Sequence, residues 1–183
     1  GAAGGTITTA SRVSYIVAKG FLWARLPSGR CLAYGNPRLK EQVWVEEKID
    51  GEWADAGSMD REDAEKLERV GTHRIRGVSS PKATALGVNS VTKKWERFAL
   101  YGGLAQENNT QATARDLLVN GMWKAEQNGY RVIATVYDEI ISEVPRGFGN
   151  LRDFERLICE LPAWAKGIPL TAGGWRGKRY RKD

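Results

Sequence analysis

The chain has 183 residues, of which 42% are hydrophobic and 27% are charged, and its formal net charge is +6. A chain of this length can form one domain, or one and a half, and can bury about two-thirds of the surface that it exposes when unfolded. No apolar stretch approaches the roughly 20 residues that a membrane helix needs. The composition therefore excludes a membrane-spanning protein and a wholly disordered chain.

One histidine and two cysteines limit the chemistry that the chain can perform. Cys31 and Cys159 lack the spacing of a zinc site, and we expect both to be reduced, half-buried thiols of a cytoplasmic protein. His73 alone cannot form a multi-histidine metal site, and a single histidine excludes nearly every triad mechanism. Catalysis would therefore depend on carboxylates, on a metal ion that they hold, or on cations.

Charge is unevenly distributed along the chain. Residues 46–68 contain ten acidic and three basic residues, a net charge of −7, whereas the other 160 residues carry +13. Part of this positive charge lies in the basic tail, residues 174–183, where aromatic residues are interleaved. Such a surface suits nucleic acid, although a solvated basic surface would have the same composition. We expect residues 46–83 to be a charged insertion or loop region. Its acidic residues 46–68 are expected to be solvated and kept away from DNA by their sign, and a structural or assembly role is the alternative.

The first half of the chain predicts short strands joined by turns, with one short helix. The expected strands are residues 12–18, 21–26, 30–34 and 42–46. Residues 60–69 predict a polar helix that ends at Gly71. Residues 72–82, which contain Pro81, are expected to form a loop. The chain begins with Gly1 and not with Met, which is typical of a processed or recombinant boundary, and it shows no signal-peptide pattern.

The second half is more strongly patterned. Small and apolar residues recur at helical spacing and predict a long amphipathic helix over residues 104–128. The residues of this stripe are Ala114, Leu117, Leu118, Gly121, Met122 and Ala125. Strands are expected at residues 130–136, 140–144 and 168–172, the first two as a hairpin, with a helix over residues 151–161. These elements predict an α+β fold with helices packed on an antiparallel sheet.

The expected hairpin has an acidic tip, Tyr137-Asp138-Glu139, which is unusual because turns between strands favour Gly, Asn or Asp beside Gly. Two adjacent carboxylates can bind Mg²⁺, which takes few protein oxygens and completes its shell with water and substrate phosphates. An exposed acidic turn without a metal would show the same residues.

Polar residues at two other places could contact nucleic acid. Gln111 extends the stripe of the long helix, where it could donate to the minor-groove acceptors that all base pairs share, or could be a buried amide bonded to backbone. Lys93, Lys94 and Arg97 could contact phosphates or could form a charged face.

Taken in order, these segments resemble the end of the palm of family A DNA polymerases, the DNA polymerase I type, and most closely the phage branch. The resemblance covers most of the chain outside residues 46–69. It rests on residues 136–140 in the hairpin, on Gln111 and residues 114–118 in the helix, and on residues 26–30, 32–34, 87–97, 101–103, 161–164 and 174–177.

This resemblance implies a palm-type antiparallel sheet with a long packed helix and a hairpin that carries carboxylates at its tip. It implies two Mg²⁺ ions, held by two aspartates, that promote attack of a primer 3′-hydroxyl on the α-phosphate of a dNTP. Asp138 matches the metal-binding aspartate of the hairpin, Glu139 is adjacent and secondary, and Gln111 matches a glutamine that contacts the minor groove. The implied partners are primer-template DNA, dNTP and the remainder of the polymerase chain, in a bacterial or phage-infected cell.

The chain departs from the family pattern at several positions. Tyr137 stands where the family usually has His near the primer terminus, and Glu107 stands where cellular members often have Asn. The second metal-binding aspartate and the nucleotide-binding helix are not found, and we expect them upstream in a longer protein. The 183 residues alone are therefore expected to be inactive.

Two other functions remain open from the sequence. A non-catalytic nucleic-acid-binding module would need only basic charge, aromatic residues and an exposed sheet. A two-metal nuclease would need about three or four converging carboxylates, of which the chain shows one tight pair.

Overall fold

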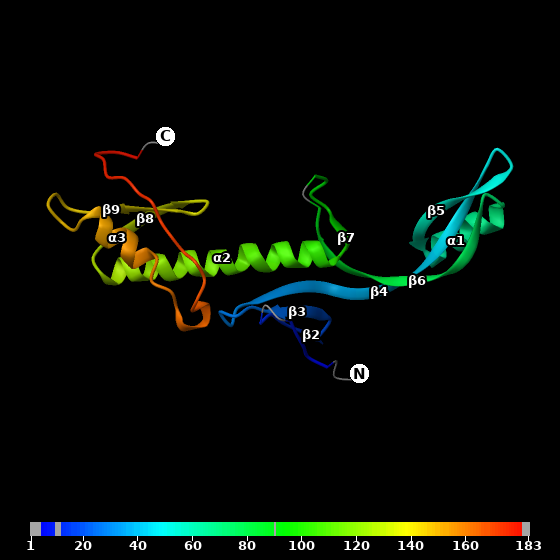
Figure 1. Cartoon of the computed structure of the whole chain (residues 1–183), viewed down its shortest axis with the longest axis horizontal. Helices are drawn as coiled ribbons and strands as arrows, with labels where there is room; N and C mark the ends of the chain where they lie inside the picture. The colour runs from blue at the N-terminus through cyan, green and yellow to red at the C-terminus, as the bar shows by residue number, and fades with distance from the viewer. Residues whose placement is uncertain (1–4, 10–11, 90, 181–183) are drawn as a thin grey trace. The chain divides into compact units, whose positions relative to one another are not determined.

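The computed structural model describes residues 5–9, 12–89 and 91–180 and has an α+β fold with a mostly antiparallel sheet, as predicted (Figure 1). The chain start, Ser90 and the end of the basic tail, residues 181–183, lie outside the described residues. The chain divides into two compact units. The first includes Ser14–Ala24 and Cys31–Glu107, and the second includes Arg25–Arg30 and the chain from Asn108 onward.

The first unit contains a seven-stranded sheet with the order β1-β2-β3-β4-β6-β7, to which β5 is added by pairing with β4. Its strands are β1 (Ile7–Thr8), β2 (Ser14–Ala18), β3 (Phe21–Arg25), β4 (Cys31–Ile49), β5 (Glu52–Asp60), β6 (His73–Val88) and β7 (Trp95–Ala99). The strands predicted in this region are confirmed, except that residues 30–34 and 42–46 belong to the single long strand β4.

Strands β4 and β6 form a long antiparallel ribbon, and the loop predicted for residues 72–82 is wrong because these residues lie in β6. The pairing shifts between Gly35 and Arg38 and again between Lys40 and Gln42. Pro37 lies in the first irregularity, and Pro81 lies opposite the second. Because proline cannot donate to a ladder, strands accommodate it at bulges, and both strands continue past their prolines.

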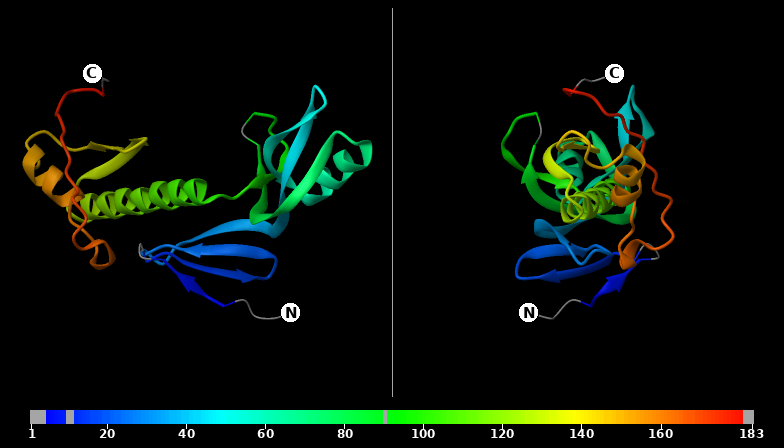
Figure 2. Two further views of the ribbon diagram at one scale, coloured as in Figure 1. Left: turned by 45° about the vertical axis from the view of Figure 1, so that its right-hand side comes forward. Right: turned by 90° about the vertical axis from the view of Figure 1, so that its left-hand side faces the viewer.

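The acidic segment is part of a folded module and not a loop. Helix α1 (Arg61–Val70) lies against β4, β5 and β6 (Figure 2). It ends at Gly71, whose φ of 79° is the left-handed conformation that glycine adopts most readily. Val43, Val45 and Ala64 are buried together between sheet and helix, with Met59 and Ile75 packed against them. We call residues 41–79 the inserted module, after the insertion that is expected in this region from the sequence.

The second unit is organised around the part of α2 (Gly102–Gln127) from Asn108 onward, the long helix that the apolar stripe predicts. It is followed by a hairpin of β8 (Arg131–Val136) and β9 (Glu139–Glu143), by α3 (Leu151–Ile158) and by a short 3₁₀ turn (Ala163–Ala165). Ala125, Tyr130 and Leu157 form a core between α2, the hairpin and α3. The predicted strand at residues 168–172 is wrong, because these residues lie in neither a helix nor a strand.

Close packing joins α2 to α3. A Cβ atom on Gly121 would lie 2.8 Å from the backbone oxygen of Ile158, so glycine allows the two helices to approach. Asn120 Nδ2 donates to the Glu160 backbone oxygen at 2.7 Å, and Lys124 Nζ lies 3.0 Å from the Glu160 carboxylate. The buried side of α2 includes Leu117, Gly121 and Ala125, as the stripe predicts, whereas Ala114 is exposed.

The exposure of the two cysteines and the apolar content of the helices can be compared with the expectations from the sequence. Both cysteines are free, and Cys159 is half-buried as expected, but Cys31 is exposed. Among the described helices, none is both long and apolar enough to cross a membrane.

Candidate metal and nucleic-acid site

The candidate metal site lies at the loop of the β8–β9 hairpin. Val136 pairs with Glu139, so the loop consists of the two residues Tyr137 and Asp138. Tyr137 has a φ of 54° and is 88% exposed. Positive φ at the first residue of a two-residue loop is usually supplied by glycine, and a bulky residue there is strained. Backbone strain of this kind is common at functional sites, so the strain at Tyr137 supports a functional role for this residue.

Both carboxylates of the tip are exposed, and they differ in their contacts. Glu139 Oε2 accepts a hydrogen bond from the Tyr180 hydroxyl at 3.0 Å. This hydrogen bond is the main reason that the pKa of Tyr180 is raised above its ordinary value. No hydrogen bond to the Asp138 side chain is formed by any of the described residues. Asp138 can therefore offer its oxygens to a ligand, while Glu139 is oriented by Tyr180.

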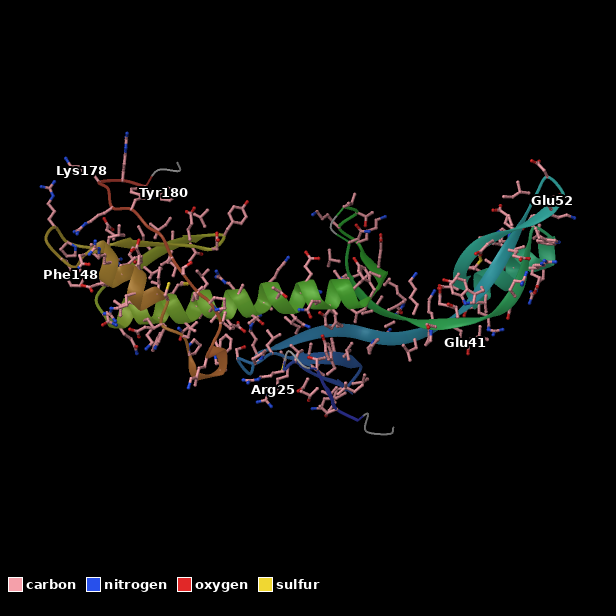
Figure 3. The ribbon with its side chains drawn as sticks, in the orientation of Figure 1. Arg25, Glu41, Glu52, Phe148, Lys178 and Tyr180 are labelled. Carbon is pink, nitrogen blue, oxygen red and sulfur yellow. The ribbon has the colours of Figure 1, made fainter. Side chains whose placement is uncertain are left out.

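The basic tail is part of the second unit and is fixed there by hydrogen bonds to the α3 region and to Glu139. Gly174 N donates to Glu155 Oε1 at 2.7 Å. The Arg176 guanidinium donates to the backbone oxygens of Phe148 and Gly149, at 3.2 Å each. Figure 3 shows Lys178 and Tyr180 on this tail. The tail thus brings cationic side chains into the same compact unit as the hairpin carboxylates.

The donor set fits part of a magnesium shell. Mg²⁺ binds one or two carboxylates and fills its other positions with water and substrate phosphates, so Asp138 with Glu139 could supply one side of such a shell. Within the described residues, no group of three or more His, Cys, Asp or Glu side chains could hold a metal ion. The three or four converging carboxylates that a two-metal nuclease needs are therefore not found in the described part of the chain.

Asp116, unlike the tip carboxylates, is largely buried, and its contacts give it a structural role. Its side chain is 12% exposed and accepts a hydrogen bond from the Ser28 hydroxyl. Arg30 Nε donates to Asp116 Oδ1 at 2.6 Å, and Arg30 Nη2 donates to the Ala112 backbone oxygen at 2.6 Å. The loop of residues 26–30 is thereby fixed to α2. Sequence reasoning missed this contact because nothing in the spacing relates residues 86 positions apart.

Gln111 and Glu107 lie on α2, four residues apart and therefore on the same helix face. Both side chains are exposed, so the alternative of a buried amide at Gln111 is wrong. The buried amide of this helix is Asn109, which is 5% exposed. The contact of Gln111 with a groove of nucleic acid stays a prediction.

The three predicted phosphate contacts belong to the first unit, whereas the hairpin carboxylates belong to the second. Lys93 and Lys94 are exposed in the turn before β7, where Asn89 Oδ1 accepts from Val91 N at 2.8 Å. Arg97 is half-buried on β7, and its Nη1 donates to the Asn36 backbone oxygen at 3.0 Å and to Thr84 Oγ1 at 3.1 Å. Part of the Arg97 guanidinium is therefore used within the sheet.

Comparison with known proteins adds one relationship. No protein-family model matches the chain, and no solved structure matches it. The chain is 33% identical over 171 residues to a protein named DNA polymerase from Bacillus phage SP02. The match covers 93% of this chain and 21% of that polymerase, so the chain spans about a fifth of the relative's length. The chain is thus related to a phage DNA polymerase.

Proposed function

We propose that this chain supplies the C-terminal part of the palm of a family A DNA polymerase, which adds dNTPs to a primer 3′-hydroxyl. The observation that carries the proposal is the 33% identity to a phage DNA polymerase across 93% of the chain, which includes the hairpin with its exposed carboxylates. Because the chain spans 21% of that relative, further parts of the active site would come from other regions of a longer polymerase.

In this proposal Asp138 is a metal ligand and Glu139 is a secondary carboxylate beside it. Bound Mg²⁺ would activate the primer hydroxyl and neutralise charge on the departing pyrophosphate. Asp138 lies in a loop of only two residues, so its carboxylate is presented at a fixed point of the hairpin. Glu139 is held by Tyr180 at 3.0 Å, and it can orient ligands next to Asp138. A second aspartate, from chain outside these 183 residues, would complete the site.

The remaining predicted residues would bind the primer-template. Gln111 would donate to minor-groove acceptors, which all base pairs present, and would sense base-pair shape without reading sequence. Glu107, on the same helix face, and Tyr137, at the hairpin tip, would lie near the duplex. Lys93, Lys94 and Arg97 would contact phosphates, which position DNA without specifying its sequence.

The test replaces Asp138→Asn in the complete polymerase that contains this chain. We expect primer extension to fall by about a hundredfold or more, because a metal ligand is lost, with primer-template binding nearly unchanged. The matched control is Glu143→Gln, an exposed carboxylate on the same hairpin, which should leave extension unchanged. Extension by the Asp138→Asn enzyme at the wild-type rate would contradict the proposal and would favour a non-catalytic nucleic-acid-binding module.

The same assay on the 183 residues alone should show no extension, because the second aspartate and the nucleotide-binding helix are proposed to come from elsewhere. Robust dNTP incorporation by this chain would contradict that part of the proposal and leave the role of Asp138 to be judged by the substitution.

A further inference from the structure

We propose that the inserted module carries a binding face for single-stranded nucleic acid, on the side of its sheet opposite α1. We call this side the open face. It is defined by Trp44, Glu46, Lys48, Trp53, Asp55, Arg74 and Arg76. The proposal is independent of the polymerase site, because it uses only residues of the inserted module and none of the residues proposed above to bind metal, primer-template or phosphates.

Alternation along β4 separates the two faces of the module. Val43 and Val45 are buried against Ala64 of α1, so the side chain of Trp44, between them, points to the opposite face. Trp44 is 49% exposed although it lies in a central strand of the module. Its cross-strand neighbours are Ser58 on β5 and Gly77 on β6. Neither neighbour is large enough to cover an indole ring, so the ring remains accessible to a flat ligand.

A second aromatic group on the open face is surrounded by cations. Trp53 pairs with Lys48 across β4 and β5. The Arg74 guanidinium lies 4.8 Å from the centre of the Trp53 ring, and Lys48 Nζ lies 5.9 Å from it. Cations at these distances are attracted to the face of the ring. They hold positive charge on the surface beside an aromatic platform, which is the combination that proteins use to bind single strands.

Both carboxylates of the open face accept hydrogen bonds from within the module. Glu46 is 15% exposed and receives hydrogen bonds from both Arg74 and Arg76, so two guanidinium groups share one carboxylate. Asp55, opposite Glu46, accepts a hydrogen bond from Gly57 N at 2.8 Å. Three cations therefore outnumber two engaged carboxylates on this face, although residues 46–68 are acidic as a whole.

Single-stranded nucleic acid fits this face better than a protein partner does. A protein interface is expected to have an apolar centre with few charges. Here the two indoles are separated and bordered by charged or small residues. Bases can stack on an indole or on a guanidinium plane only when they are unpaired, while their phosphates can meet Lys48, Arg74 and Arg76. A duplex would keep its bases inside and gain only the phosphate contacts.

The experiment measures fluorescence anisotropy of a labelled 12-nucleotide oligo-dT, and of a 12-base-pair duplex, with the 183-residue chain at low salt. Trp44→Ala should weaken oligo-dT binding at least about fivefold, since stacking on one aromatic residue is lost, and should leave duplex binding unchanged. Trp44→Phe should restore most of the affinity. Trp123→Ala removes a 64% exposed indole from α2 and is the matched control, with no change expected.

Glu46→Gln gives a result of opposite sign. Removal of the carboxylate frees Arg74 and Arg76 for phosphates, so oligo-dT affinity should rise several-fold and should depend more steeply on salt. The variant must keep the circular dichroism spectrum of the wild type, because an unfolded basic chain could also bind DNA more strongly. The proposal is overturned if Trp44→Ala leaves oligo-dT affinity unchanged, if it weakens oligo-dT and duplex equally, or if Glu46→Gln fails to raise the affinity. The absence of any oligo-dT binding would also overturn the proposal and would favour a protein partner for this face.

Discussion

Tyr137 combines an exposed ring with a strained backbone, and the two properties can be separated by substitution. At a φ of 54° any residue with a Cβ atom is strained, whereas glycine is not. We expect the Tyr137→Gly protein to be more stable than the Tyr137→Ala protein by about 1 kcal/mol, because both lack the ring and only alanine keeps the strain. Urea denaturation of the two variants measures the difference.

Hydrogen exchange of the β8 and β9 amides provides a local control for this prediction, since relief of strain in the loop should slow exchange in the hairpin first. Equal stability of the two variants would mean that the loop relaxes when the ring is removed. The backbone at position 137 would then store no strain that glycine can relieve.

Close packing between α2 and α3 depends on the absence of a side chain at Gly121. In the Gly121→Ala protein, the new Cβ atom would lie 2.8 Å from the Ile158 backbone oxygen, so the helices must separate. We expect the free energy of unfolding to fall by about 1–3 kcal/mol, the usual cost of overpacking. Gly102→Ala is the control, because no atom lies within 4 Å of its Cβ position, and its effect should be smaller than about 1 kcal/mol. Similar effects of both substitutions would contradict the close approach.

The inserted module contains a polar contact that should make its stability depend on pH. Asp60 accepts hydrogen bonds from Lys40 and from Gln42, whose side chain is buried. These bonds, above all that from Lys40, lower the pKa of Asp60 below its ordinary value of 3.8. The contribution of the ionised carboxylate is therefore present above pH 3.8 and is lost as the pH falls through the lower pKa of the folded state.

We expect Asp60→Asn to destabilise the module by about 1 kcal/mol at pH 7, and the gap between variant and wild type to narrow as the pH falls below 3.8. Thermal unfolding at a series of pH values measures this gap. Asp63→Asn removes an exposed carboxylate from α1 and should leave stability nearly unchanged. If the difference in stability between Asp60→Asn and wild type stayed constant with pH, the charge of Asp60 would contribute nothing to the stability of the module.

Across the whole molecule, local patterns predicted the helices and the hairpin. The stripe that ends at Ala125 predicted α2, and the polar segment before Gly71 predicted α1, because helix periodicity and capping are properties of neighbouring residues. Strand β6 was missed because its structure depends on pairing with β4, from Gly35 to Glu47, and because Pro81 suggested a loop. The bulges that accommodate the prolines are set by the partner strand and cannot be predicted from either segment alone.

In the candidate site too, features of neighbouring residues were predicted, whereas contacts between residues far apart in sequence were not. An acidic pair at a turn predicted the position of Asp138 and Glu139 on the hairpin. The contact of Tyr180 with Glu139 and that of Arg74 with Trp53 join residues 41 and 21 positions apart. Neither pair has a spacing that predicts contact, since only the folded chain brings them together.

The ribbon of β4 and β6 also bears on how this protein could change over evolution. Lys40 and Lys82 are direct cross-strand partners, so the chain leaves the main sheet and returns to it at adjacent points. Residues between such points can be gained, lost or exchanged as a block, because a tight turn can rejoin two antiparallel strands. Related chains are therefore expected to vary greatly in length at this one place while the flanking strands keep their register.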